Sequence, residues 1–264
     1  RLGPMAAIVA HGSIYAHQQS AGTSSPELTT ALRRAEDAPG LGVMCSYYGG
    51  VYFSYRQALE LDALAEEIAR LPVNARDSAM AALLVAASEV VSSVGSHFAQ
   101  PIQPWRPDGR LKEALLASVT KKRALSVIGR FSAVCARLGN SKPSAFGGTA
   151  HRCDYREFLD SRSTDTSVVY ADPPYTRDHY SRFYHVLETL AIGDRPEISR
   201  TNLNGGRALS RGLYRVDRHQ SPFCICTQAP AAFQELFAGV RRLEAPLVLS
   251  YSPFDAARSH RPRV

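Results

Sequence analysis

The sequence predicts an α/β protein that carries a region of helices ahead of its sheet-forming part. From Gly147 onward, short β-favouring runs alternate with turns and helical segments, which is typical of α/β folds. Between Ser54 and Leu138, apolar residues instead recur at helical spacing. The 264 residues suffice for one large domain or two smaller ones with a substantial core.

Helix signals divide the first part into three segments. Ser54 and Gln57 have the spacing of a capping box and open a helix that runs to about Leu71. Its expected apolar face consists of Leu61, Leu64, Ala65 and Ile68. A second helix is expected from Ala75 to about Val94, capped by Asn74 with Asp77 and buried on most sides. A third is expected from Leu111 to about Leu138, with a break near Gly129.

The second part is expected to alternate strands and helices. Thr149–Cys153 is predicted as a strand ending at Asp154, and Tyr155–Leu159 as a short helix. Arg182–Leu190 should form a helix that packs on the sheet through Val186, Leu187 and Leu190. A long arginine-rich loop over residues 192–223 should then lead to a helix at Ala231–Arg242 and a buried strand at Pro246–Tyr251.

Composition limits the function classes. The formal charge of +7 and the pI near 9.3 favour a polyanionic partner. Basic residues dominate Pro104–Lys142, which indicates either a phosphate-binding surface or a solvated helix face. The sequence has no membrane-length apolar run, no signal-peptide pattern and no zinc-ligand spacing, so we expect no membrane partner and no metal site. Five cysteines without disulfide-rich spacing favour the reducing cytoplasm.

The most informative stretch is Ser167–Tyr175. Its β-favouring residues run into Asp172-Pro173-Pro174-Tyr175, and prolines cannot donate ladder hydrogen bonds. The strand should therefore end at Ala171 or Asp172, with an acidic and an aromatic side chain at its carboxyl end, where α/β sheets bind ligands. A rigid turn with an incidental Asp and Tyr is the structural alternative.

Asp172-Pro173-Pro174-Tyr175 resembles the catalytic motif of S-adenosylmethionine-dependent methyltransferases that act on exocyclic amines. The Asp form is typical of Dam-like, D12-class DNA adenine-N6 methylases. Thr176–His185 is similar to that family's next segment, and weaker similarity extends from Tyr47 to Pro253. The resemblance implies a Rossmann-like S-adenosylmethionine-dependent methyltransferase core with a helical insertion. It divides the chain into a core remnant (1–44), a helical, basic target-recognition region (45–146) and a catalytic α/β region (147–264).

The implied reaction transfers a methyl group from S-adenosylmethionine to adenine N6 of a base flipped out of double-stranded DNA at a specific site. Asp172 and the Pro173 carbonyl would accept the two amine N–H groups and free the lone pair, while Pro174 stiffens the turn. The carboxylate would also stabilise the positive charge that develops on nitrogen. Tyr175 would stack on the flipped base.

The resemblance also suggests binding residues. Asp154 and Tyr155 would contact the adenine part of the cofactor, and the alternative of Asp154 as a helix N-cap is compatible with this role. Tyr47–Phe53, aromatic and glycine-rich, is either a turn packed by aromatics or a cofactor or DNA contact. The expected nucleic-acid contacts are His97, Gln100 and Trp105 in a loop, Lys121, Lys122 and Arg123 in the basic helix, and His179, Tyr180 and Arg182 after the motif.

One family feature has no counterpart. D12-class enzymes carry a Phe-x-Gly-x-Gly loop for the methionine end of the cofactor, and this sequence has none. We therefore expect a chain cut at both ends that is incomplete as an enzyme. The alternatives are a DNA-binding fragment or inactive remnant, or methylation of cytosine N4 or an RNA guanine, although Ser more often replaces the Asp in cytosine-N4 enzymes. A companion restriction endonuclease is compatible with the resemblance.

Overall fold

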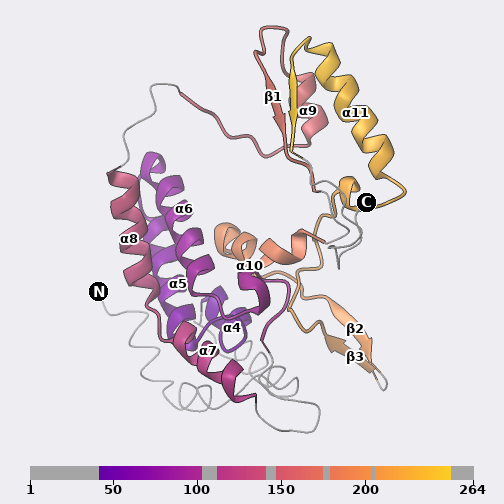
Figure 1. Ribbon diagram of the computed structural model, residues 1–264. Coiled ribbons are helices and arrows are strands. Elements are labelled where there is room, and N and C mark those ends of the chain that lie inside the picture. The colour runs from indigo at the N-terminus through magenta and orange to yellow at the C-terminus, as the bar shows by residue number, and fades with distance from the viewer. Residues whose placement is uncertain (1–41, 103–111, 141–146, 175–178, 204–205, 251–264) are drawn as a thin grey trace. The chain divides into compact units, whose positions relative to one another are not determined.

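The computed structural model describes residues 42–102, 112–140, 147–174, 179–203 and 206–250 (Figure 1). Most of the expected core remnant at 1–44, together with Trp105 and Tyr175, lies outside the described residues. The chain divides into two compact units: the first holds residues 1–141 and 182–218, and the second holds residues 142–181 and 219–264. Within the described residues, no helix is long and apolar enough to cross a membrane.

The first unit is built mainly of helices. These are α4 (Val43–Tyr48), α5 (Tyr55–Ala69), α6 (Val73–Val90), the short 3-10 helix η1 (Val94–Ser96), α7 (Glu113–Arg123) and α8 (Val127–Gly139). Helix α5 packs against α4 and α6, and α8 lies along both α6 and α5 (Figure 1). The expected third helix is therefore two helices, and the break, which was expected near Gly129, lies between Arg123 and Val127. Ser126 starts the second one, because its side chain accepts a hydrogen bond from Gly129 N.

Of the caps predicted for helices α5 and α6, one is confirmed and one is wrong. The capping box of α5 is confirmed: the Ser54 side chain accepts from Gln57 N, and the Gln57 side chain accepts from Ser54 N. Helix α6 begins after Pro72 without a side-chain cap, so the cap expected from Asn74 and Asp77 is wrong. It is also buried on one face of its second half only, because Val85 is 39% exposed.

Aromatic residues make up the centre of the first unit. Tyr48, Tyr52, Phe53 and Phe98 are all fully buried in one cluster. A Cβ at Gly49 would lie 2.7 Å from the Tyr55 ring, so only glycine lets the turn pack this closely. The interpretation of Tyr47–Phe53 as an aromatic-packed turn is confirmed.

Helix α10 (Ser181–Ile192) contributes to this same cluster from the sequence after the motif. Val186 and Leu190 are buried with the aromatic residues and with Leu213. The expectation that this helix packs on the sheet is wrong, because the aromatic side chains of the helical unit meet its apolar face instead.

The expected loop at 192–223 contains an antiparallel hairpin, so the prediction of a loop is wrong there. Strand β2 (Arg200–Leu203) pairs with β3 (Gly206–Leu209), in a register that sets Arg200 opposite Leu209. Asn204-Gly205 stands between the strands in the sequence. This dipeptide is the pair most favoured in two-residue hairpin loops, so the hairpin had a readable signal.

The second unit contains the sheet-forming part. Strand β1 (Val169–Ala171) pairs in parallel with β4 (Leu247–Leu249), with Val169 opposite Leu247 and Ala171 opposite Leu249. Helix α9 (Tyr155–Asp160) packs on α11 (Ala229–Arg242), which follows the 3-10 helix η2 (Pro222–Cys224). Leu159, Leu236 and Val240 form its core, against which β1 and β4 pack.

Both expected strands of the pair and both helices are confirmed, although β4 is not fully buried, since Val248 is 52% exposed. The strand expected at Thr149–Cys153 is wrong: these residues are exposed and pair with no strand in the described part of the chain. Helices combined with a parallel strand pair agree with an α/β fold class.

Candidate functional site

The proline turn ends β1 where the sequence predicted. Val169 N donates to Pro246 O at 2.9 Å, and Ser250 N donates to Ala171 O at 2.8 Å, so the ladder is complete up to Ala171. Asp172 follows as an exposed residue, whereas Pro173 is buried. Within the described residues, no hydrogen bond or ion pair engages the Asp172 carboxylate. The strand end therefore presents a carboxylate that is available to accept hydrogen bonds.

Asp154 lies in the same unit and caps α9. Its Oδ1 accepts from Arg156 N at 2.9 Å, and its two oxygens also accept from the Arg156 guanidinium at 2.9 and 3.1 Å. These hydrogen bonds lower the pKa of the Asp154 carboxyl. The N-cap interpretation is confirmed. Each carboxylate oxygen has two lone pairs, so Oδ2 can accept one more hydrogen bond, and the cofactor role stays a prediction.

Tyr155, the first residue of α9, joins this helix to α11. Its hydroxyl donates to Ala232 O at 3.2 Å, and its ring centroid lies 5.4 Å from that of Phe223. The ring therefore takes part in the packing of the second unit. Its expected contact with a cofactor stays a prediction.

The two loop residues expected to contact bases differ in exposure. His97 is half-buried, its ring centroid lies 4.3 Å from that of Phe183, and its Nδ1 accepts from Ala99 N at 3.2 Å. Gln100 is exposed, and its backbone carbonyl accepts from Val94 N at 3.1 Å. Packing thus orients His97, while the Gln100 side chain faces solvent.

The three consecutive cations of α7 also differ from one another. Lys121 is exposed. Lys122 is half-buried and donates from Nζ to Glu89 O at 2.9 Å. Arg123 is half-buried and donates to Gly50 O at 2.8 Å, and burial lowers the pKa of its guanidinium. Only Lys121 extends freely into solvent, because the other two side chains are hydrogen-bonded within the fold.

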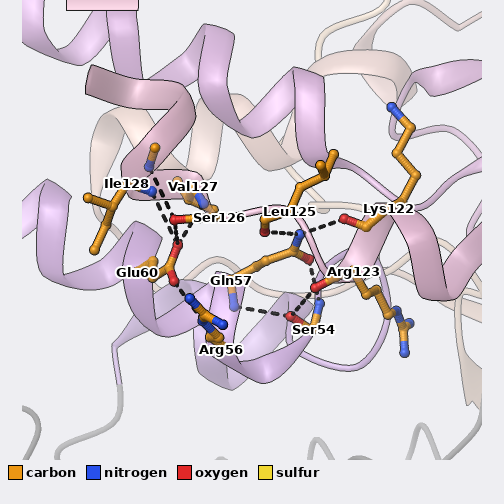
Figure 2. A network of polar contacts seen from close by, with 11 residues as sticks. Ser54, Arg56, Gln57, Glu60, Lys122, Arg123, Leu125, Ser126, Val127 and Ile128 are labelled. Atoms are coloured by element: carbon orange, nitrogen blue, oxygen red, sulfur yellow. Dashed lines mark hydrogen bonds and ion pairs between the residues drawn. The ribbon is translucent and has the colours of Figure 1, made fainter. Parts of the chain in front are cut away.

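Helix α5 holds the junction of α7 and α8 (Figure 2). The Gln57 amide donates to Lys122 O and Leu125 O, each at 2.9 Å. The Glu60 carboxylate accepts from Val127 N at 2.6 Å and from Ile128 N at 3.2 Å. Helix ends leave such carbonyls and N–H groups without partners, so α5 satisfies both ends of the break. The sequence showed Gln57 only as part of a capping box, and nothing local indicated Glu60.

The sequence did not indicate a further buried polar centre, which is formed around Arg215. Arg215 is 3% exposed and pairs with Asp194 through two bonds of 2.6 and 2.7 Å, and with Asp217 at 2.8 Å. His185 is fully buried, and its Nε2 lies 3.1 Å from Phe98 O. Burial lowers the pKa of His185 to about 3, so the imidazole is neutral at physiological pH.

The division into units separates the expected site residues. The second unit contains Asp154, Tyr155 and Asp172–Pro174, together with His179 and Tyr180, both half-buried. The first unit contains the other expected nucleic-acid contacts: His97, Gln100, Lys121, Lys122, Arg123 and Arg182. Among the described residues, no group of three or more His, Cys, Asp or Glu side chains could hold a metal ion.

Comparison with known proteins agrees with the sequence motif. Residues 132–222 match the family model described as D12 class N6 adenine-specific DNA methyltransferase. The modification methylase LlaI of Lactococcus lactis subsp. lactis is 32% identical over 91 residues, which are 34% of this chain and 13% of that protein. No solved structure matches. Residues 132–222 are thus similar to the D12 class, and the expected resemblance is confirmed there, over a small share of that relative's length.

Proposed function

We propose that this chain acts in methyl transfer from S-adenosylmethionine to adenine N6 in double-stranded DNA, on a Rossmann-like core. The observation that carries the proposal is the Asp172 carboxylate at the carboxyl end of β1, which no described residue engages and which lies inside the segment that matches the D12 class. Ligands of parallel α/β sheets bind at this end. By analogy with modification methylases, a companion restriction endonuclease is a further proposed partner.

The chemistry follows from what Asp172 and its neighbour can accept. The exocyclic amine of adenine is a poor nucleophile because its lone pair is delocalised into the ring. Two hydrogen bonds, to the Asp172 carboxylate and the Pro173 carbonyl, would localise this lone pair on nitrogen. The carboxylate would then stabilise the positive charge that develops there. Fixed positioning of the base contributes further, because it makes the encounter effectively unimolecular.

The cofactor supplies an electrophilic methyl group on its sulfonium. Asp154 would bind its adenosine part, using the acceptor capacity that Arg156 leaves on Oδ2. Tyr155 would border the same site from the first position of α9. Extruding the base from the duplex costs a few kcal/mol of stacking and pairing free energy, which hydrogen bonding and stacking in the site must offset. Tyr175 is the proposed stacking residue.

Methylation of mixed-sequence DNA tests the proposal. The chain is incubated with excess S-adenosylmethionine for long enough to complete one turnover. The DNA is then digested and its nucleosides are analysed. N6-methyldeoxyadenosine should form with the wild type and be lost in Asp172→Ala. Asp165→Ala, an exposed carboxylate of the same unit, is the matched control and should retain the product. Near-normal product in Asp172→Ala would contradict the mechanism.

A second candidate is a DNA-binding protein that methylates nothing. It is favoured by the absence of a Phe-x-Gly-x-Gly sequence from the 264 residues. Binding of labelled S-adenosylmethionine separates the two, because this candidate binds DNA and no cofactor. The same nucleoside analysis would reveal N4-methyldeoxycytidine if the methylated amine were that of cytosine.

A further inference from the structure

Two arginines that lie far apart in the sequence share one aromatic ring. The Cζ atom of Arg182, on α10, lies 5.2 Å from the ring centroid of Tyr214, and the Cζ atom of Arg218 lies 5.0 Å from it. The ring itself is fixed in place. The Tyr214 hydroxyl donates to Ala99 O, and the Tyr214 backbone N donates to Ser210 Oγ at 3.1 Å. The centroid of the Tyr214 ring lies 5.2 Å from that of the His185 ring. All of these residues belong to the first unit.

No acid among the described residues pairs with either of these two cations. Among the described residues, neither Arg182 nor Arg218 has a carboxylate partner, and only Arg218 makes a hydrogen bond, from Nε to Arg215 O at 2.6 Å. Arg215, in the same segment, shows the contrast: its buried guanidinium pairs with two carboxylates, those of Asp194 and Asp217. Burial and the charge of Arg182 both lower the pKa of Arg218, so the two cations repel each other.

The exposed Arg211 adds to this charge. Its positive charge, like those of Arg182 and Arg218, acts on the Tyr214 hydroxyl and opposes the rise in pKa that burial causes. Arg211 has no carboxylate partner in the described part of the chain either. Two guanidiniums held over one fixed ring, with the charge of Arg211 added to theirs, favour an anion as the ligand of this site.

We propose that Arg182 and Arg218, held against the ring of Tyr214, clamp phosphate groups of the DNA backbone. This proposal rests on the proposed function, because it takes DNA as the polyanion, and it adds a phosphate-binding site to it. A guanidinium presents a planar fork of donors that matches phosphate oxygens, and stacking on a ring limits its rotation. Arg182 follows Asp172 by ten positions in the sequence. Backbone contacts here would fix the register of the DNA and carry no base specificity.

The salt dependence of DNA binding tests the clamp. Binding of the 264-residue chain to a fluorescent duplex of mixed sequence is followed by anisotropy over a salt series. Arg182→Gln should weaken binding about tenfold at low salt and lower the slope of log K against log salt by about one. The double variant with Arg218→Gln should lower the slope by about two. Arg70→Gln removes an exposed arginine that Glu66 and Glu67 already neutralise, and should leave the slope unchanged.

Two further variants make the test specific. Arg218→Gln also loses a hydrogen bond within the fold, so Arg182→Gln alone, an exposed side chain, must lower the slope. The double variant Arg182→Lys with Arg218→Lys keeps both charges but loses the planar guanidinium forks. Its salt slope should equal that of the wild type, whereas its affinity for the duplex should be lower. Wild-type affinity in this variant, or an Arg182→Gln slope equal to that of Arg70→Gln, would overturn the clamp. So would a wild-type chain that does not bind the duplex.

The outcome is separable from that of the proposed function. Methyl transfer is measured with Asp172→Ala, and the clamp is measured by binding alone. If the salt slopes shift as expected and no N6-methyldeoxyadenosine forms, the clamp stands and the methyl-transfer proposal fails. If product forms and the slopes do not shift, the reverse holds.

Discussion

Replacing Glu60 should destabilise the first unit far more than replacing an ordinary surface glutamate. Its side chain is 11% exposed and reaches from α5 to the start of α8, where Val127 N and Ile128 N donate to it. Ser126 satisfies a third N–H of that helix start, from Gly129. Glu60 therefore acts as a cap supplied by a neighbouring helix, and its negative charge faces the positive end of the α8 dipole.

The magnitude follows from what Glu60→Ala leaves behind. An unsatisfied buried N–H costs about 1–3 kcal/mol, and Val127 is fully buried. Loss of the charge at the helix start adds about 0.3–1 kcal/mol. The ion pair with Arg56 adds little, because the Arg56 side chain is 62% exposed. We expect a loss of about 2–4 kcal/mol in the free energy of unfolding, and about 1 kcal/mol for Glu60→Gln, which keeps an acceptor oxygen.

Urea unfolding followed by circular dichroism measures this difference. Glu66→Ala is the matched control, since it removes an exposed glutamate of the same helix, whose ion pair among the described residues is with Arg70, and it should cost less than about 1 kcal/mol. Equal destabilisation by Glu60→Ala and Glu66→Ala would refute the assignment of Glu60 as a cap.

Three other predictions concern single side chains. Lys121→Gln should lower the salt slope of DNA binding without loss of stability, whereas Arg123→Gln should lower the urea midpoint because Gly50 O loses its donor; equal midpoints would contradict this. Burial raises the pKa of Asp62 to about 6 from 3.8, against hydrogen bonds from Met44 N and Cys45 N. The free energy of unfolding of the wild type should therefore fall by about 2–3 kcal/mol relative to that of Asp62→Asn as the pH rises from 4 to 7. A difference between the two proteins that does not change with pH would refute this prediction. Tyr175→Phe should keep most methyl transfer, whereas Tyr175→Ala should lose about 1–3 kcal/mol of base stacking; equal activity of the two would exclude a stacking role.

Features of the fold that depend on neighbouring residues could be predicted from the sequence. The capping box at Ser54, the end of β1 before Pro173 and the N-cap at Asp154 each follow from one or two side chains and their own backbone. The position of Asp172 belongs to this group, because a proline turn after a strand fixes where it lies. Local physical chemistry decides these three features, whereas the cap expected from Asn74 and Asp77 shows that a local signal does not always prevail.

Features that depend on distant contacts could not be predicted. The periodicity of α10 shows an apolar face but does not say whether a sheet or the aromatic cluster around Tyr48 covers it. Arg215 reads as one cation in an arginine-rich segment until Asp194 and Asp217 are placed beside it. The same is true of Arg182 and Arg218, whose shared partner Tyr214 is visible only in the folded chain.

The last prediction concerns the cofactor. In doubly wound folds a glycine turn brings backbone N–H groups close to the ligand, since only glycine allows that approach without a Cβ clash. Gly49-Gly50 cannot serve, because it packs against the Tyr55 ring, and Gly147-Gly148 is exposed, with no described residue within 4 Å of an added Cβ. We therefore expect the chain to bind S-adenosylmethionine weakly, through the adenosine end at Asp154. Asp154→Asn, which keeps the helix cap, should bind more weakly still, and Asp154→Ala should bind no cofactor. Calorimetry measures all three, and an upstream segment with a strand and a glycine-rich turn should restore affinity. Tight, stoichiometric binding by the chain alone would show that its cofactor pocket is built from other residues.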